Sequence, residues 1–176
     1  MARNVEIKAR VTDFDHQYQL AHELAGQQST VIDHVDHFFN CASGRLKLRV
    51  LSPAEGYLIF YDQPNQAGPK LSSYLISKTT EPEKLLNALN AAYGVRTTVR
   101  KTRNYWMAGR TRIHLDQVES LGNFLELEVV LDDSEDVAVG VREAEGLMKN
   151  LGIVDEQLVE SAYVDLLEAR NSKSSE

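Results

Sequence analysis

Charged and apolar residues alternate along most of the β-like segments of this chain. The runs are Asn4-Val-Glu6-Ile-Lys8-Ala-Arg10, Arg45-Leu-Lys47-Leu-Arg49, Arg110-Thr-Arg112-Ile-His114-Leu-Asp116 and Glu126-Leu-Glu128. Successive side chains of a β-strand point to opposite faces, so each run puts its charges on one face and its Val, Ile and Leu on the other. The charges are also sorted by sign, because some runs carry mainly carboxylates and others mainly Lys and Arg. The pattern therefore predicts a sheet with one polar face on which cationic and acidic zones are separate.

About eight strands can be counted, and they follow one another as hairpins and meanders. Closing such a sheet into a barrel removes its edges and gathers alternate residues inside. We expect an α+β, strand-dominated fold: an eight-stranded antiparallel β-barrel with flanking helices. The expected strands cover 3–11, 30–40, 45–51, 57–62, 71–78, 95–107, 110–118 and 122–131.

Helix signals lie between and after the strands. A single domain is expected over 1–170, followed by a disordered polar tail over 171–176. The N-cap residues are predicted from Ser, Thr and Asp positions that precede apolar stripes, and the helix ends from glycines. The expected helices cover 14–26, 80–94, 134–152 and 159–169, with Asp13, Thr80 and Ser134 as N-caps.

Composition narrows the class of protein. The chain has 176 residues, 43% of them hydrophobic, a formal net charge of −7 and one cysteine, Cys41. A net acidic chain is a poor nucleic-acid binder, and a single cysteine cannot form an intramolecular disulfide. The N-terminus has no signal-peptide pattern, and no apolar run is long enough to cross a membrane. We expect a cytoplasmic protein with no nucleic-acid or membrane partner.

The acidic residues Glu6, Glu126 and Glu128, with Asp116 as a further candidate, form a possible metal site. Mg²⁺ and Mn²⁺ prefer carboxylate oxygens together with substrate phosphate and water. An E-x-E pair alone is more often a solvated strand face. The apolar residues that flank this pair indicate a central strand, and this favours a functional site.

The basic residues form a second set on the same kind of face. Arginine binds phosphate oxygens in a bidentate way, and lysine acts as a compact positive charge. For any one pair, salt bridges between strands are the simpler interpretation, but pairs in four strands favour an anion site. The set is Lys8, Arg45, Lys47, Arg49, Lys101, Arg103, Arg110 and Arg112. Of the histidines, His16, His22, His34 and His37 are expected to be structural; His114 shares a face with Arg112 and Asp116, and a structural role is favoured for it over contact with a ligand.

In this order along the chain, the motifs resemble the CYTH superfamily, the triphosphate tunnel metalloenzymes, and most of all its class IV adenylate cyclase branch. Asn4-Val-Glu6-Ile-Lys8 resembles the E-x-E-x-K signature, and Leu46-Lys47-Leu48-Arg49 and Lys101-Thr-Arg103 resemble the basic strands. The C-terminal matches are His114-Leu-Asp116-Gln-Val-Glu-Ser-Leu-Gly122, Phe124-Leu-Glu126-Leu-Glu128 and Ser161-Ala-Tyr163-Val-Asp-Leu-Leu167. The resemblance covers about 3–167.

The resemblance implies an eight-stranded antiparallel tunnel that binds a triphosphate with Mg²⁺ or Mn²⁺. Glu6 and Lys8 would be catalytic, and the metal ligands would be Glu6, Asp116, Glu126 and Glu128. The triphosphate-binding residues would be Lys8, Arg45, Lys47, Arg49, Lys70, Lys101, Arg103 and Arg112.

The chain departs from the family pattern at two places. Asn4 stands where the signature has its first glutamate, which leaves one or two metals open. Asp62-Gln63-Pro64 stands where relatives often have a lysine before Gly-Pro, and Lys70 is the candidate replacement.

Three functions fit the sequence. The leading one is divalent-metal-dependent hydrolysis of inorganic triphosphate or a related linear triphosphate such as thiamine triphosphate. The alternatives are a class IV adenylate cyclase that converts ATP to cyclic AMP and pyrophosphate, and a non-catalytic triphosphate-binding module. The oligomeric state is left as monomer or homodimer.

Overall fold

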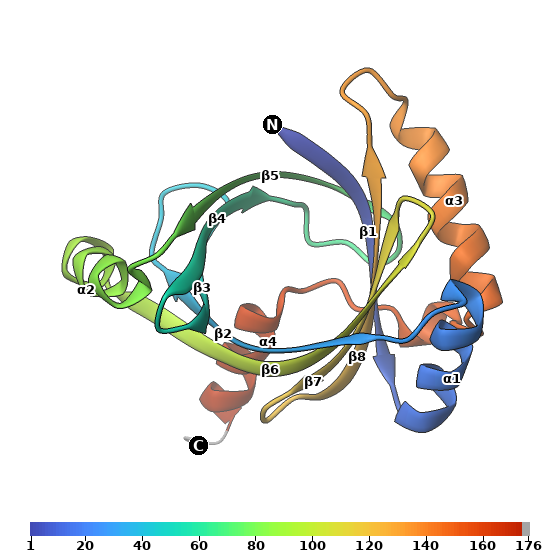
Figure 1. Cartoon of the computed structure of the whole chain (residues 1–176), viewed down its shortest axis with the longest axis horizontal. Helices are drawn as coiled ribbons and strands as arrows, with labels where there is room; N and C mark the ends of the chain where they lie inside the picture. Colours follow the sequence, from blue (N-terminus) through green and yellow to red (C-terminus); the bar gives the residue numbers. More distant parts are fainter. Residues whose placement is uncertain (174–176) are drawn as a thin grey trace.

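The computed structural model describes residues 1–173 and consists of a closed β-barrel with four α-helices around it (Figure 1). Its strands are β1 (Ala2–Val11), β2 (Thr30–Phe39), β3 (Arg45–Ser52), β4 (Glu55–Asp62), β5 (Lys70–Thr79), β6 (Val95–Ala108), β7 (Thr111–Val118) and β8 (Gly122–Leu131). Its helices are α1 (Phe14–Ala25), α2 (Pro82–Tyr93), α3 (Val137–Asn150) and α4 (Tyr163–Lys173), with a 3₁₀ turn η1 at Asp155–Gln157. The expected fold class is confirmed.

The strand order around the barrel is β1-β5-β4-β3-β2-β6-β7-β8, and neighbouring strands are antiparallel. Two meanders, β2 to β5 and β6 to β8, account for most of the wall. β1 closes the barrel because it pairs with β5 on one side and with β8 on the other. This closure places Glu6 opposite both Lys70 and Glu128, and Lys8 opposite Glu126.

The main hydrophobic core lies outside the barrel, between its wall and the helices α1 and α3. It contains the outward-facing residues of β1, β7 and β8, among them Val5, Ile7, Ile113 and Leu127, which are all nearly fully buried. Gly140 of α3 lies directly against Val5 and Leu131, so this helix packs closely on β1 and β8. The apolar residues of the alternating strands thus pack outward, and the charged residues point inward.

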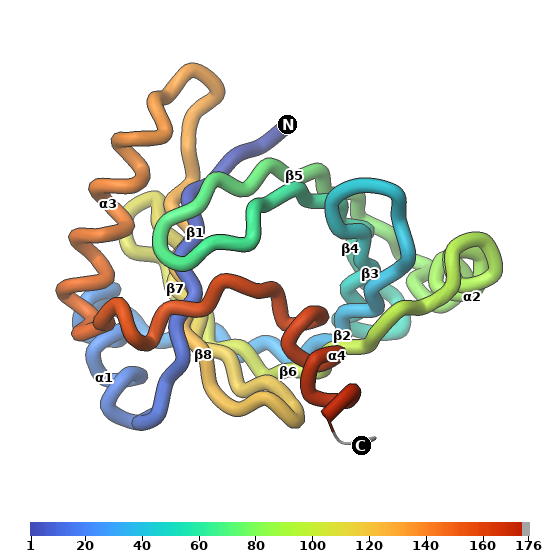
Figure 2. The backbone as a smooth tube through the Cα atoms, turned by 180° about the vertical axis from the view of Figure 1, so that it is seen from behind, coloured from blue at the N-terminus to red at the C-terminus, as the bar shows by residue number. Residues whose placement is uncertain are grey.

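A C-terminal strap, residues 158–163, crosses one end of the barrel before α4 (Figure 2). It is attached to β1: Ala9 forms a β-bridge with Leu158, and the Val159 N–H donates to the Lys8 carbonyl at 2.9 Å. Tyr163 and Leu167 then pack with Phe124 and Val99 in a second buried cluster. The strap therefore covers one end of the lumen with polar backbone and an aromatic ring.

Some predicted boundaries need correction. Asp136, not Ser134, is the N-cap of α3, and its side chain accepts from the Ala138 N–H. At α2 the N-cap is Glu81 without a side-chain cap bond, so the expected capping box at Thr80 is wrong. The expected tail from residue 171 begins inside α4, which runs to Lys173, and 174–176 lie outside the described residues. Within residues 1–173, no helix has the length and apolar character needed to span a membrane.

Candidate functional site

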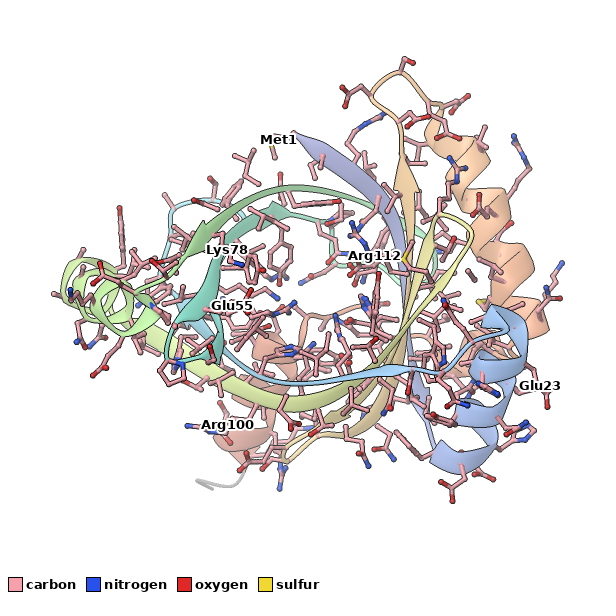
Figure 3. All side chains as sticks on the ribbon, in the orientation of Figure 1. Met1, Glu23, Glu55, Lys78, Arg100 and Arg112 are labelled. Carbon is pink, nitrogen blue, oxygen red and sulfur yellow. The ribbon has the colours of Figure 1, made fainter. Side chains whose placement is uncertain are left out.

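The barrel encloses a cavity of about 310 Å³ that is lined by side chains from all eight strands and from the strap. Figure 3 shows these side chains crowding the bore of the barrel, with Arg112 reaching in from β7. Six cations line the cavity: Lys8, Lys47, Arg49, Lys101, Arg103 and Arg112. Four carboxylates line it as well: Glu6, Asp36, Glu126 and Glu128.

Glu126 and Glu128 lie side by side on β8, and His114 of β7 lies next to both. The Nδ1 atom of His114 is 3.6 Å from Glu126 Oε2 and 3.6 Å from Glu128 Oε1. One possible ligand atom from each of these three side chains falls within 4.8 Å of the others. The predicted placement of the two glutamates inside the barrel is confirmed, and His114 joins them.

Glu6 of β1 extends this acidic group across the barrel seam, because it is the register partner of Glu128. Burial raises the pKa of the Glu6 carboxyl to about 7, and repulsion by Glu126 acts in the same direction. The lysine Lys8, on the same strand face, has its Nζ 3.3 Å from Glu126 Oε1. The two residues predicted to be catalytic therefore border the acidic group.

The structure does not group Asp116 with these carboxylates. Its oxygens accept from Lys101 Nζ at 2.9 Å and from Arg103 Nε and Nη2, both at 2.6 Å, and Tyr163 adds its hydroxyl at 3.1 Å. Burial would raise the pKa of Asp116, but Arg103 and Lys101 outweigh it and hold the pKa below its usual range. Asp116 is fully buried and is not among the residues that line the cavity. Because four donor atoms bind its oxygens, its role is to position Lys101 and Arg103.

Asp36 plays the same part on β2, which β6 separates from β7, and the sequence reasoning missed it. It accepts from Lys47 Nζ at 2.9 Å and from Arg49 Nε and Nη2 at 2.8 and 2.9 Å. Burial acts to raise its pKa, yet Arg49 and Lys47 hold that pKa well below the usual range. The signal was available, because Asp36 shares the period-2 phase of His34 and Phe38, which also line the cavity.

The strap holds two of the lumen lysines. The Tyr163 ring lies 4.2 Å from Lys8 Nζ and 4.5 Å from Lys101 Nζ, measured to the ring centroid. Lys8 also donates to the Ser161 carbonyl at 3.3 Å. Tyr163 was quoted for the family resemblance but was not predicted as a site residue, since its approach to β1 and β6 depends on contacts far apart in sequence.

Three predicted or candidate cations lie off the cavity surface. Lys70 donates to the carbonyls of Gln66 and Glu160, at 3.3 and 2.9 Å, so its ammonium is used by the loop and the strap. Arg45 pairs with Asp165 of α4 at 2.8 Å. Arg110 pairs with Glu135 and with Glu143 on α3, outside the barrel.

Within residues 1–173, four side chains that line the lumen have a buried polar atom without a hydrogen-bond partner: Asn4, His34, Gln63 and His114. Both ring nitrogens of His34 and the Oδ1 of Asn4 have no hydrogen-bond partner. Burial and the nearby Arg49 lower the pKa of His34 to about 2, so its ring stays neutral. The sequence-based prediction that His34 is structural is therefore incomplete, because His34 lines the cavity. His37 does not line it and forms a hydrogen bond with Thr98.

One part of the lumen is apolar and aromatic. Ile32, Ile59 and Ile76 line it together with Tyr74 and Tyr105. Ile76 is 54% exposed, so this wall reaches the surface and marks an open mouth away from the strap.

The donor set fits the divalent metal that the resemblance implies. Glu126 and Glu128 supply the carboxylates that Mg²⁺ and Mn²⁺ prefer. The buried His114 Nδ1 beside them has no hydrogen-bond partner in the described chain, as expected for an atom that awaits another partner. Glu6 lines the same cavity opposite Glu128 but is not one of the three side chains whose ligand atoms lie within 4.8 Å, and the oxygens of Asp116 are bound by Lys101, Arg103 and Tyr163.

Comparisons with known proteins agree with this architecture. The CYTH domain model matches residues 2–163, and no curated protein matches the chain. The PH1012 protein from Pyrococcus horikoshii OT3 superposes with a TM-score of 0.82 at 20% identity, covering 93% of this chain and 98% of that one. A proposed adenylate cyclase from Vibrio parahaemolyticus gives 0.75 at 19% identity, with 94% and 97% covered.

A protein from Hippeastrum, HpAC1, is a proposed adenylyl cyclase described as having a dominant triphosphatase activity. It superposes with a TM-score of 0.60 at 15% identity, covering 98% of this chain and 96% of that one. At these identities the likeness concerns the fold. The family match, by contrast, spans every strand of the barrel, and this chain belongs to the CYTH domain family.

Proposed function

We propose that this protein is a divalent-metal-dependent hydrolase of inorganic triphosphate or a related linear triphosphate. The observation that carries the proposal is the charge pattern of the lumen, in which six cations line one cavity with the acidic group of Glu126 and Glu128, three of these cations contact that group, and His114 lies beside it. Linear triphosphate is a compact polyanion whose oxygens accept charge-assisted hydrogen bonds from Lys and Arg. The cytoplasm, with the free thiol of Cys41 kept reduced, is the compartment we propose.

The lumen residues divide the work of the reaction. Water attacks the terminal phosphorus, the bond to the bridging oxygen breaks, and pyrophosphate leaves. Lys47 and Arg49 from β3 and Arg112 from β7 hold phosphate oxygens, and positioning of this kind supplies most of the catalysis in phosphoryl transfer. Lys8 lies beside Glu126 and can neutralise charge on the bridging oxygen.

Glu6 is the candidate acceptor of the proton of the attacking water. A carboxylate whose pKa lies near neutrality in the metal-free site suits a general base. The divalent ion would be held by Glu126 and Glu128 and would neutralise charge on the transferring phosphoryl group.

The test is turnover of tripolyphosphate with Mg²⁺, with Mn²⁺ and with a chelator, followed by release of orthophosphate and pyrophosphate. We expect divalent-dependent hydrolysis that Glu128→Gln abolishes, because the amide keeps the shape but removes the ligand charge. Glu145→Gln, an exposed carboxylate on α3, is the control and should hydrolyse like the parent. Full turnover by Glu128→Gln at low Mg²⁺ would contradict the proposal.

A second candidate is favoured by the apolar wall of Ile32, Ile59, Ile76, Tyr74 and Tyr105. Such a surface can hold the organic part of a nucleoside triphosphate, and the reaction would then be that of an adenylate cyclase. In it the ribose 3′-hydroxyl attacks the α-phosphorus and pyrophosphate leaves. Abundant cyclic AMP from ATP and Mn²⁺, with tripolyphosphate left intact, would favour the cyclase. Tight triphosphate binding with neither product would indicate a binding module.

A further inference from the structure

We infer that His114 is itself a ligand of the divalent cation, so that the site has one nitrogen and two carboxylate donors and prefers transition-metal ions to Mg²⁺. This inference rests on the metal of the proposed function but assigns a ligand that neither the family signature nor the E-x-E pair contains.

The ring nitrogen of His114 lies between the two glutamates. Nδ1 lies 3.6 Å from an oxygen of each glutamate, beyond ordinary N–H···O hydrogen-bond distance. Two ligand atoms on one ion with bonds of about 2.1 Å are separated by roughly 3.0–3.5 Å, depending on the geometry. The two Nδ1–oxygen distances thus exceed this separation only slightly, and the three ligand atoms, which lie within 4.8 Å of one another, would move closer together around an ion.

The same nitrogen has no hydrogen-bond partner in the described chain. His114 Nδ1 is buried and has no hydrogen-bond partner in residues 1–173, and only 5% of the side chain is exposed. A buried nitrogen left unpaired destabilises the folded state unless something else satisfies it. A cation between the glutamates would satisfy it.

The imidazole ring of His114 is held in place by its strand and by a neighbouring ring. His114 and Glu126 are register partners on neighbouring strands, and the Tyr105 ring lies 5.6 Å from the imidazole between centroids. Ligands carried on paired strands are positioned more firmly than ligands on loops. The ring therefore has little freedom to turn away from the two carboxylates.

The chemical consequence is selectivity. Mg²⁺ prefers oxygen ligands, whereas an imidazole nitrogen adds affinity for first-row transition ions. Arg103 and Arg112 already hold one oxygen of Glu126 and of Glu128, at 2.6 and 3.1 Å. The two arginines compete with the metal ion for the carboxylate oxygens. The nitrogen donor therefore determines whether the site binds a transition-metal ion more tightly than Mg²⁺.

The experiment measures metal binding directly, without turnover. Metal-free protein is titrated with Mn²⁺ and, in competition, with Mg²⁺, with and without tripolyphosphate, and the bound Mn²⁺ is examined for nitrogen hyperfine coupling by pulsed electron paramagnetic resonance. We expect tighter binding of Mn²⁺ than of Mg²⁺ and clear nitrogen coupling. In His114→Gln we expect the coupling to disappear and Mn²⁺ affinity to fall at least about tenfold, with a much smaller change for Mg²⁺.

His34→Gln is the matched control, because it replaces the other buried lumen histidine, which lies among Arg49, Asp36 and Lys101 rather than at the glutamates. It should keep both the Mn²⁺ affinity and the nitrogen coupling. Circular dichroism confirms that both variants are folded. Bound Mn²⁺ without nitrogen coupling, coupling that persists in His114→Gln, or no Mn²⁺ binding under either condition overturns the inference.

The outcome is separable from the proposed function. Hydrolysis of tripolyphosphate without nitrogen coupling would remove His114 from the metal and leave the hydrolase intact. Nitrogen coupling without hydrolysis or cyclisation would keep the mixed-donor site and remove the proposed reaction.

Discussion

Arg103 and Arg112 both bind carboxylates in the lumen, but they differ in burial. Arg103 is 6% exposed and contacts Asp116 and Glu126, with the closest distances at 2.6 Å. Arg112 is 33% exposed and contacts Glu128 at 3.1 Å. Removing one partner of a buried ion pair leaves an uncompensated charge, whereas a more exposed pair is screened by water.

We therefore expect Arg103→Ala to lower the free energy of unfolding by about 3–5 kcal/mol, and Arg112→Ala by about 1 kcal/mol or less. Urea denaturation of both variants measures the difference. Equal losses would mean that the carboxylates around Arg103 are solvated on its removal. The contrast also matters for activity assays, because a loss of turnover in Arg103→Ala would include a loss of folded protein.

The buried His34 should make the stability of the protein depend on pH. Its pKa is about 2 in the folded state, where Arg49, Lys101 and Arg103 face it along with Asp36, against 6.5 for the ordinary side chain. Below pH 6.5 the unfolded chain binds a proton that the folded chain does not, so stability falls as the pH falls toward the folded pKa.

Between about pH 7.5 and about pH 5, this linkage amounts to about 2 kcal/mol of unfolding free energy. His34→Gln should remove that part of the pH dependence, and denaturant titrations of parent and variant at the two pH values measure it. Parallel pH profiles would show that His34 is protonated in the folded state.

At the residue scale, the period-2 phase predicted which side chains enter the lumen, including Glu6, Lys47, Arg49 and Glu128. It could not predict which of them remain available to a ligand. Asp116 shares the phase of His114, but Lys101, Arg103 and Tyr163 occupy it. That pairing depends on strand register, which the pattern of a single strand does not contain.

At the scale of elements, helix α3 carries two glycines in opposite environments. A Cβ on Gly140 would lie 2.7 Å from Leu131 Cδ2 and 2.9 Å from Val5 Cγ2, whereas a Cβ on Gly146 would meet nothing within 4 Å. Overpacking a buried contact destabilises by about 1–3 kcal/mol, and alanine favours a helix over glycine by up to about 1 kcal/mol.

We expect Gly140→Ala to destabilise the protein and Gly146→Ala to stabilise it slightly, as measured by thermal and urea unfolding. The two substitutions add the same methyl group to the same helix, so each is the control for the other. Equal changes of the same sign would show that α3 can shift on β1 and β8.

The sequence predicted the existence and type of all the main elements, because alternation and helical stripes are local signals. It placed the N-caps of α2 and α3 wrongly, since several Ser, Thr and acidic residues compete near each start. Local sequence signals could not predict the position of the strap. Its position depends on the backbone bond from Val159 to Lys8 and on the Tyr163 contacts, which join distant segments.

For the whole molecule, the barrel reverses the usual arrangement of core and surface. Charge fills the lumen, while the apolar side of the same strands packs against α1 and α3. The sequence indicated a closed sheet but not its order, because closure by β1 between β5 and β8 is a pairing across the full length of the chain. The cost of enclosing these charges suggests that a bound polyanion and metal stabilise the folded state.

We expect tripolyphosphate together with Mn²⁺ to raise the melting temperature. A ligand at 100 times its dissociation constant stabilises by about 2.7 kcal/mol, or roughly 5–10 °C for a domain of this size. Differential scanning calorimetry measures the shift. A chelator should reduce it strongly, and orthophosphate should give little. An unchanged melting temperature would mean that the lumen does not take up the polyanion.

The position of the strap has a consequence for how substrate enters the lumen and how product leaves it. Residues 158–163 cross one end (Figure 2), and Ile76, which lines the cavity, is 54% exposed, so we expect substrate and product to use the same opening. Pyrophosphate would leave past the same cations that bind the next substrate. Product and substrate would therefore compete for these cations. Initial-rate kinetics should then show pyrophosphate as a competitive inhibitor against tripolyphosphate. A purely noncompetitive pattern would require a second way out, past the strap.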